Sequence, residues 1–231
     1  MRTKPYVLIE LPTDFIARMH ALNSLDTTVQ PRHEKGPINR KDQAEIYTIV
    51  NALELGLSLP IPLPASVIHS DRPDIVIDSA VAKIGIEIVE AVSETIAAMD
   101  CEMARLPNAP EFHWAMKQLP GEKQKTAAGV RELVFNNYPG DGFTGNGAAE
   151  WAAAIAHFVR RKIETVSKPK FQRFEKSWLL VYDNWREPAR NLEEAGTNLQ
   201  SLMNDMKAFG IFDLILVLDD ERLRVFEPTH F

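Results

Sequence analysis

The stretch HSDRPDIVIDSAVAKIGIEIVEAV, residues 69–92, contains two apolar runs separated by a short polar segment. Residues 75–77 are a β-branched run, and residues 84–92 alternate between two faces, as expected for strands. The segment between the runs predicts a turn, so the whole stretch is typical of a β-hairpin. One face of the second strand is expected to carry Ile84, Ile86 and Ile88, and the other Gly85, Glu87 and Val89.

This hairpin is expected to bring two acids together. A turn centred between Ala80 and Val81 places Asp74 directly across from Glu87. Like charges directly opposite on a sheet repel, so the pair calls for a compensating cation or a different register. A hard divalent ion such as Mg²⁺, or Mn²⁺ in its place, takes carboxylate ligands and can activate water at a phosphodiester. The alternative is a solvent-facing hairpin with two unrelated acids.

The same residues resemble a known signature. Pro73-Asp74, followed by the run Gly85-Ile-Glu87-Ile-Val-Glu, resembles the PD-(D/E)XK motif of restriction-endonuclease-like nucleases. The resemblance implies that Asp74 and Glu87 bind a metal ion, with the backbone carbonyl of Ile88 as a further ligand. The family's usual lysine falls on Val89, which is apolar and cannot orient water. Either the lysine comes from elsewhere in the chain, or the protein does not cleave.

Lys162 is the main candidate for a relocated lysine. Residues 150–166 are expected to form a helix with an apolar stripe, and at 100° per residue Lys162 lies about 20° from Trp151, inside that stripe. A lysine on a core-facing stripe either extends to solvent or meets a carboxylate, because an unpaired buried ammonium is costly. Lys83 and Lys168 are weaker candidates.

A second helix supplies a third acid. Asn39 or Asp42 is expected to cap a helix that runs to Leu57, and Glu45 lies close to its apolar stripe. In several restriction-endonuclease-like families an acid on the first core helix completes the metal site, which the resemblance implies for Glu45. An ordinary surface glutamate is the alternative.

The charge distribution is uneven. The net charge of −6 does not favour a protein that coats nucleic acid, but residues 160–176 carry +5, which leaves −11 on the rest of the chain. Such a basic strip either follows a phosphate backbone beside the acidic site or is a solvated helix end and loop. The candidate nucleic-acid-binding residues are Arg160, Arg161, Lys168, Lys170 and Arg173.

The remaining patterns predict an α/β fold with a mixed central β-sheet flanked by helices. An α-β-β-α-β order between Glu45 and Asp183 matches the restriction-endonuclease-like core, and residues 177–183 read as a strand buried on both faces. We expect a single domain over residues 1–231, with its core at about 38–226 and a variable insertion at about 93–147. Further expected elements are a strand at 6–11, helices at 14–25 and 192–209, and strands at 212–218 and 222–226.

Other motifs are weaker. Gly140, Gly142 and Gly145 match a GxGxxG pattern, but without the flanking strand that a dinucleotide site needs, so a flexible loop is expected. The six histidines show no paired spacing for zinc. His69 lies five residues before Asp74 and could reach the acidic site, but it is expected in an exposed loop.

These features predict a Mg²⁺- or Mn²⁺-dependent nuclease that acts on DNA more than on RNA. The alternative is a catalytically inactive module of the same fold that binds nucleic acid or a protein partner. A homodimer is expected if both strands of a duplex are cut. The single Cys101 and the lack of a long apolar segment or signal peptide predict a cytoplasmic protein with no membrane role.

Overall fold

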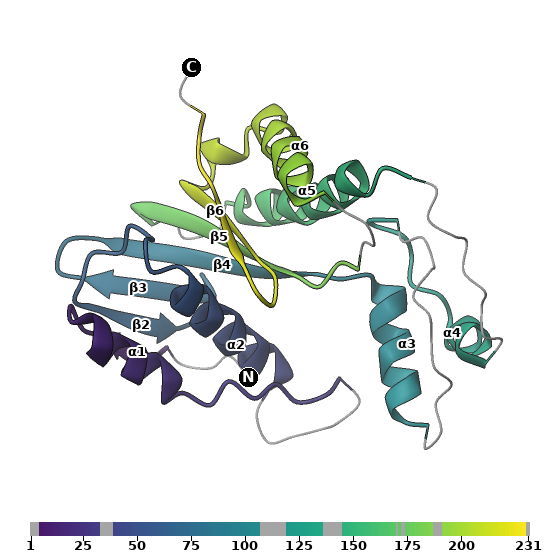
Figure 1. Ribbon diagram of the computed structural model, residues 1–231, viewed down its shortest axis with the longest axis horizontal. Coiled ribbons are helices and arrows are strands. Elements are labelled where there is room, and N and C mark those ends of the chain that lie inside the picture. Colours follow the sequence, from purple (N-terminus) through teal and green to yellow (C-terminus); the bar gives the residue numbers. More distant parts are fainter. Residues whose placement is uncertain are drawn as a thin grey trace.

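A computed structural model describes residues 5–32, 39–106, 119–135, 145–169, 171, 174–186 and 191–229. Its centre is a seven-stranded sheet in which the strands lie in sequence order, β1-β2-β3-β4-β5-β6-β7 (Figure 1). The strands are β1 (Tyr6–Leu11), β2 (Ala65–His69), β3 (Ile75–Ser79), β4 (Lys83–Ala91), β5 (Lys176–Asp183), β6 (Leu214–Leu218) and β7 (Leu223–Phe226).

The sheet is mixed. Strands β4, β5 and β6 pair in parallel, whereas the pairings β1–β2, β2–β3, β3–β4 and β6–β7 are antiparallel. Parallel neighbours need a long crossover, which α5 provides between β4 and β5 and α6 provides between β5 and β6. The expected α/β class, with a mixed sheet flanked by helices, is confirmed.

Helices cover both faces of the sheet. Figure 1 shows α5 (Gly147–Val166) and α6 (Leu192–Asp205) on one side, and α1 (Phe15–Asn23) and α2 (Arg40–Leu55) on the other. The α2 helix begins after Asn39, whose side chain accepts a hydrogen bond from the Lys41 amide, and ends at Gly56. Asn39, one of the two expected caps, is therefore the residue that caps this helix.

The predicted hairpin register is confirmed. Strands β3 and β4 pair Ile75 with Ile86 and Ile77 with Ile84, the register in which Asp74 comes opposite Glu87. These four isoleucines are almost completely buried in the hydrophobic cluster beneath α1 and α2. Because a one-residue slip would turn the isoleucines away from that cluster, the apolar pattern fixes the register and with it the position of the two acids.

Strand β5 is an inner strand of the sheet, between β4 and β6, and is buried on both faces, as predicted. Leu179 and Val181 pack in the cluster beneath α5 and α6, whereas Trp178 and Leu180 pack in the cluster beneath α1 and α2. The continuous apolar run in the sequence therefore reflects two cores that share one strand.

Several expectations were wrong in detail. Residues 65–69 form a strand, β2, between α2 and the hairpin, so the α-β-β-α-β order contains an additional strand. Helix α6 ends at Asp205 instead of 209, and a short 3-10 helix, Ala208–Gly210, follows it after Lys207, which has a left-handed backbone conformation.

The region expected to be a variable insertion contains two helices, α3 (Glu94–Ala104) and α4 (Ala127–Phe135). They pack on each other through a small separate cluster of Ile96, Met99, Val130 and Val134. Figure 1 shows this pair beyond the end of the sheet. None of the helices in the described ranges is both long enough and apolar enough to cross a membrane.

A glycine in β4 is required by close packing. A Cβ atom built on Gly85 would lie 2.8 Å from Cδ2 of Phe174 and 3.1 Å from Cγ of Pro73. We expect Gly85→Ala to lower the free energy of unfolding by about 1–3 kcal/mol because it overpacks this contact. Gly129→Ala in α4 is the matched control, since its Cβ would come no closer than 3.5 Å to a neighbour and a helical alanine gains about 1 kcal/mol. Urea unfolding measures both, and a Gly85→Ala variant as stable as wild type would contradict the packing.

Candidate metal centre

The candidate centre lies where two strands separate. Pairing between β3 and β4 ends at Ile75 and Ile86, whereas β4 continues to Ala91 alongside β5. At this point Oδ2 of Asp74 accepts a hydrogen bond from the backbone amide of Ile88 at 2.8 Å. The Asp74 side chain thus replaces the next backbone hydrogen bond between β3 and β4, and this contact holds the carboxylate beside Glu87.

Lys162, from α5, reaches this point. Its Nζ atom lies 2.5 Å from Oε2 of Glu87, 3.3 Å from Oδ2 of Asp74 and 3.0 Å from the carbonyl oxygen of Ile88. The two acids are 6% and 4% exposed. Of the two outcomes that the sequence left open for Lys162, pairing with the acids is confirmed.

Helix α2 contributes a second cation from the other face of the sheet. Nζ of Lys41 lies 2.6 Å from Oε1 of Glu45 and 3.4 Å from Oδ1 of Asp74. Asp74 is thus shared, with Oδ2 facing Lys162 and Oδ1 facing Lys41. Glu45 is 5% exposed, which excludes the alternative of an ordinary surface glutamate.

His69 completes the surroundings of Glu45. It is almost completely buried on β2, and its Nε2 atom lies 2.9 Å from Oε2 of Glu45. The expectation of an exposed loop histidine was wrong, because β2 was not recognised. The alternation of Ala65, Val67 and His69 into the core is the signal that would have identified the strand.

Burial and neighbouring charges shift the pKa values of two groups at the centre. Burial and the neighbouring charge of Asp74 raise the pKa of Glu87 to about 7, although Lys162 acts in the opposite direction. Burial lowers the pKa of Lys41, but hydrogen bonding and charge from Glu45 and Asp74 outweigh it, so the pKa lies above its ordinary value. The site therefore favours additional cationic charge.

The donor set suits a hard divalent cation. Two carboxylate oxygens and one backbone carbonyl oxygen converge on a single point, and the ammonium of Lys162 lies at that point. Mg²⁺ prefers such oxygen ligands. A second group, Asp42, Glu45 and His69, places one ligand atom from each residue within 4.8 Å of the others. That group includes a nitrogen donor, which suits Mn²⁺ or another transition metal better than Mg²⁺.

Other predicted residues lie apart from the centre. Lys83 pairs with Asp78 at 2.6 Å, so it does not supply the site lysine. Arg160, Arg161 and Lys168 are exposed on α5 and just after it. The candidate residues Lys170 and Arg173, and the glycine pattern at 140–144, lie outside the described residues.

Lys41 is the residue that the sequence interpretation missed. It was not assigned to the site, although its i, i+4 spacing from Glu45 is visible in the sequence. Its contact with Asp74 joins residues 33 positions apart, so only the packing of α2 against the hairpin could show it.

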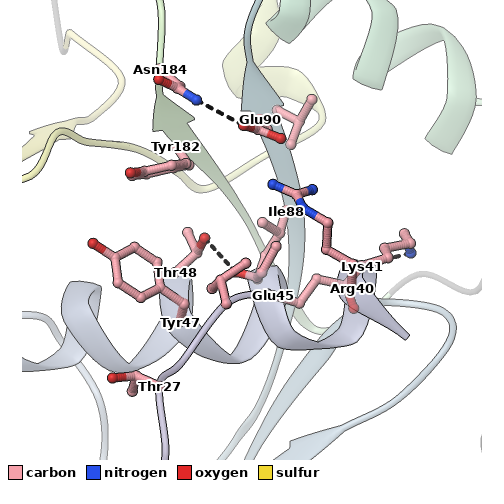
Figure 2. Close-up of a pocket in the computed structure, with 13 residues that line it drawn as sticks. Thr27, Arg40, Lys41, Glu45, Tyr47, Thr48, Ile88, Glu90, Tyr182 and Asn184 are labelled. Carbon is pink, nitrogen blue, oxygen red and sulfur yellow. Dashed lines mark hydrogen bonds and ion pairs between the residues drawn. The ribbon is translucent and has the colours of Figure 1, made fainter. Parts of the chain in front are cut away.

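A cleft of about 660 Å³ opens beside the centre, between α2 and the ends of β4 and β5 (Figure 2). Lys41, Glu45 and Ile88 belong to both the cleft and the centre. Its further lining includes Arg40, Tyr47, Glu90, Tyr182 and Asn184.

Comparisons of the chain with models of known protein families, with curated proteins and with solved structures found no match. The case for a function therefore rests on the geometry and chemistry of the site.

The raised pKa of Glu87 predicts a pH-dependent stability in EDTA. The folded state retains a proton on Glu87 up to about pH 7, whereas the unfolded state loses it near 4.5, so this group's contribution to stability falls as pH rises between those values. Glu87→Gln removes that fall. We expect the free energy of unfolding of the variant, relative to that of wild type, to rise by on the order of 2 kcal/mol from pH 5 to pH 8.

Chemical denaturation at both pH values measures the gain. Asp78→Asn is the matched control, because it removes an acid of the same hairpin that lies in an exposed pair with Lys83. If the stability of Glu87→Gln and that of wild type depended equally on pH, the pKa of Glu87 would not be raised in the folded protein.

Proposed function

We propose that the protein is a metal-dependent nuclease of the restriction-endonuclease-like class that hydrolyses phosphodiester bonds, with DNA preferred over RNA. The observation that carries this proposal is the convergence of Asp74, Glu87 and the Ile88 carbonyl on one point, with a lysine from a distant helix beside them. Buried like-charged acids are unfavourable for stability, so such a pair at a strand end is typical of a functional site.

The arrangement of elements supports the same class. A helix (α2), a hairpin (β3–β4), a crossover helix (α5) and a parallel strand (β5) occur in the order that the sequence resemblance implied, with β2 before the hairpin and α3 and α4 after it. The additional strand β2 extends the sheet beyond the hairpin and does not interrupt the pairing of β3, β4 and β5.

In this proposal Asp74, Glu87 and the backbone carbonyl of Ile88 hold the metal ion, and Glu45 is an auxiliary ligand on the Lys41 side. A bound Mg²⁺ or Mn²⁺ supplies Lewis-acid chemistry, because it polarises the phosphodiester and lowers the pKa of a water. Asp74 is fixed for this role by the Ile88 amide, so little reorganisation is needed.

Lys162 takes the part that the family's usual lysine plays from the position of Val89. Its ammonium lies against both acids and is carried on a flexible four-carbon stem. When a metal ion takes these oxygens, the flexible stem would let the ammonium move beside the ion, where it orients the attacking water or stabilises negative charge on the phosphate oxygens. Lys41 balances part of the acidic charge from the opposite side.

Helix α5 and the residues just after it present a basic surface on which the nucleic-acid backbone could bind. Arg160 and Arg161 are exposed on the same helix that carries Lys162, and Lys168 is exposed just beyond it. Contacts of this kind position a substrate through its phosphates without reading its sequence. Lys170 and Arg173 are proposed for the same surface from the sequence alone.

The second candidate function is a catalytically inactive module of this fold that binds nucleic acid or a protein partner. The observation that favours it is the close contact of Lys162 with all three oxygen donors, which leaves the acids partly neutralised without a metal ion. In such a module the lysines would serve as permanent structural counter-ions.

Cleavage assays separate the two functions. We expect wild type to cleave plasmid, linear duplex or single-stranded DNA in Mg²⁺ or Mn²⁺ but not in EDTA, with RNA a weaker substrate. Glu87→Gln and Lys162→Met should each lower the rate by roughly 100-fold or more, as expected for groups that stabilise the transition state.

Asp78→Asn and Lys83→Met are the matched controls, because they change an acid and a lysine of the same hairpin that pair with each other away from the centre. Both should cleave at the wild-type rate. Absence of cleavage on every substrate would favour the inactive module, and cleavage that survives in Lys162→Met would remove Lys162 from the mechanism.

A further inference from the structure

Arg40, the first residue of α2, extends into the cleft beside the metal centre. Figure 2 shows its guanidinium near Ile88 and Glu90, on the wall formed by β4. Its Nε atom is buried and has no hydrogen-bond partner among the described residues. A buried guanidinium N–H without a partner is costly, and the group carries a full positive charge, so this position favours an anion.

The nearest acid does not meet this need. Oε1 of Glu90 lies 2.5 Å from Nη2 of Arg32 and also accepts a hydrogen bond from Nδ2 of Asn184 at 2.9 Å. Glu90 is therefore already engaged with another arginine. The charge of Arg40 faces the cleft without a close ion pair among the described residues.

Two aromatic rings form another part of the same cleft. Tyr47 and Tyr182 pack edge to face, with their ring centroids 5.7 Å apart. The Tyr182 hydroxyl donates a hydrogen bond to Oδ1 of Asp220 at 2.9 Å, which fixes its ring. Burial raises the pKa of Tyr182, so the ring remains uncharged at neutral pH. In Figure 2 the two tyrosines lie to one side of the cleft and the Arg40 guanidinium to the other.

We infer that this cleft binds one unpaired nucleotide next to the bond to be cut, with Arg40 on its phosphate and Tyr47 and Tyr182 against its base. The inference rests on the proposed function, because it assigns part of the substrate to the cleft. A volume of about 660 Å³ lies in the usual range for small-molecule sites and accommodates a nucleotide. Lys41, Glu45 and Ile88 line both the cleft and the metal centre, so a strand can pass from one to the other.

This geometry also sets a substrate preference. A base that enters the cleft against a tyrosine ring is not paired with a complementary strand, since stacking on protein rings and extrusion from a duplex go together. Single-stranded DNA, frayed ends or flaps are therefore the expected substrates, and a closed duplex is bound more weakly.

Binding can be measured without cleavage. We would follow fluorescence anisotropy of a labelled four-nucleotide oligothymidylate in EDTA, and of an abasic four-unit strand that keeps the phosphates but lacks the bases. Arg40→Gln should weaken binding of both strands by about tenfold or more, because a charge-assisted contact is lost. Tyr47→Leu should weaken only the strand with bases, by about fivefold or more.

Two further variants make the test specific. Arg105→Gln removes an exposed arginine that lies 3.7 Å from Glu102 on α3, and it should bind both strands within about twofold of wild type. Arg40→Lys keeps the charge but loses the planar fork, so it should bind better than Arg40→Gln and less well than wild type. Thermal unfolding of each variant shows that it remains folded.

The outcomes separate this inference from the nuclease proposal. The cleft assignment is overturned if Arg40→Gln binds the strands with wild-type affinity, or if Arg105→Gln loses as much affinity as Arg40→Gln. Either result holds even if the protein cleaves DNA. Binding that depends on Arg40 and Tyr47 in a protein that cleaves no substrate supports the cleft and rejects the nuclease. Equal affinity for the two strands in wild type overturns the placement of the base.

Discussion

Two carboxylates that are buried side by side require positive charge, and the surroundings of the hairpin meet that requirement. Asp74 and Glu87 come together because the strand register places them there, and low-dielectric surroundings strengthen their repulsion. Lys162 and Lys41 supply the compensation from opposite faces of the sheet. A divalent cation at the same oxygens would neutralise the acids more completely than either ammonium, which links the stability of the hairpin to its proposed chemistry.

The helices that bury the sheet also hold these lysines in place. The apolar stripe of α5 packs on β4 and β5, so the packing that fixes this helix also positions Lys162. On the other face, the stripe of α2 packs against the isoleucines of the hairpin and sets Lys41 and Glu45 beside Asp74. The centre therefore depends on both hydrophobic clusters, and the cleft lined by Arg40 opens on the α2 side of the same junction.

The sequence predicted those features that local periodicity determines. The period-2 pattern of the hairpin was sufficient for its register, and the 3.6-residue period of α5 was sufficient to place Lys162 on a buried stripe. Features set by packing between distant elements were not predictable, such as the approach of Lys41 to Asp74 or the buried Nε atom of Arg40, which has no hydrogen-bond partner among the described residues. Strand β2 was missed because three prolines precede it and its inward positions end in His69, which reads as a loop residue.

Mn²⁺ binding, followed by electron paramagnetic resonance of the free ion, tests most directly whether the oxygens around Lys162 form a cation site. Wild type should bind the ion, and Glu87→Gln should bind it at least about tenfold more weakly, because a carboxylate ligand is lost. Lys162→Met should bind it more tightly than wild type, since no ammonium then competes for the same oxygens. Wild-type affinity in Glu87→Gln, or no binding by wild type and by Lys162→Met, would contradict a metal centre at this strand end.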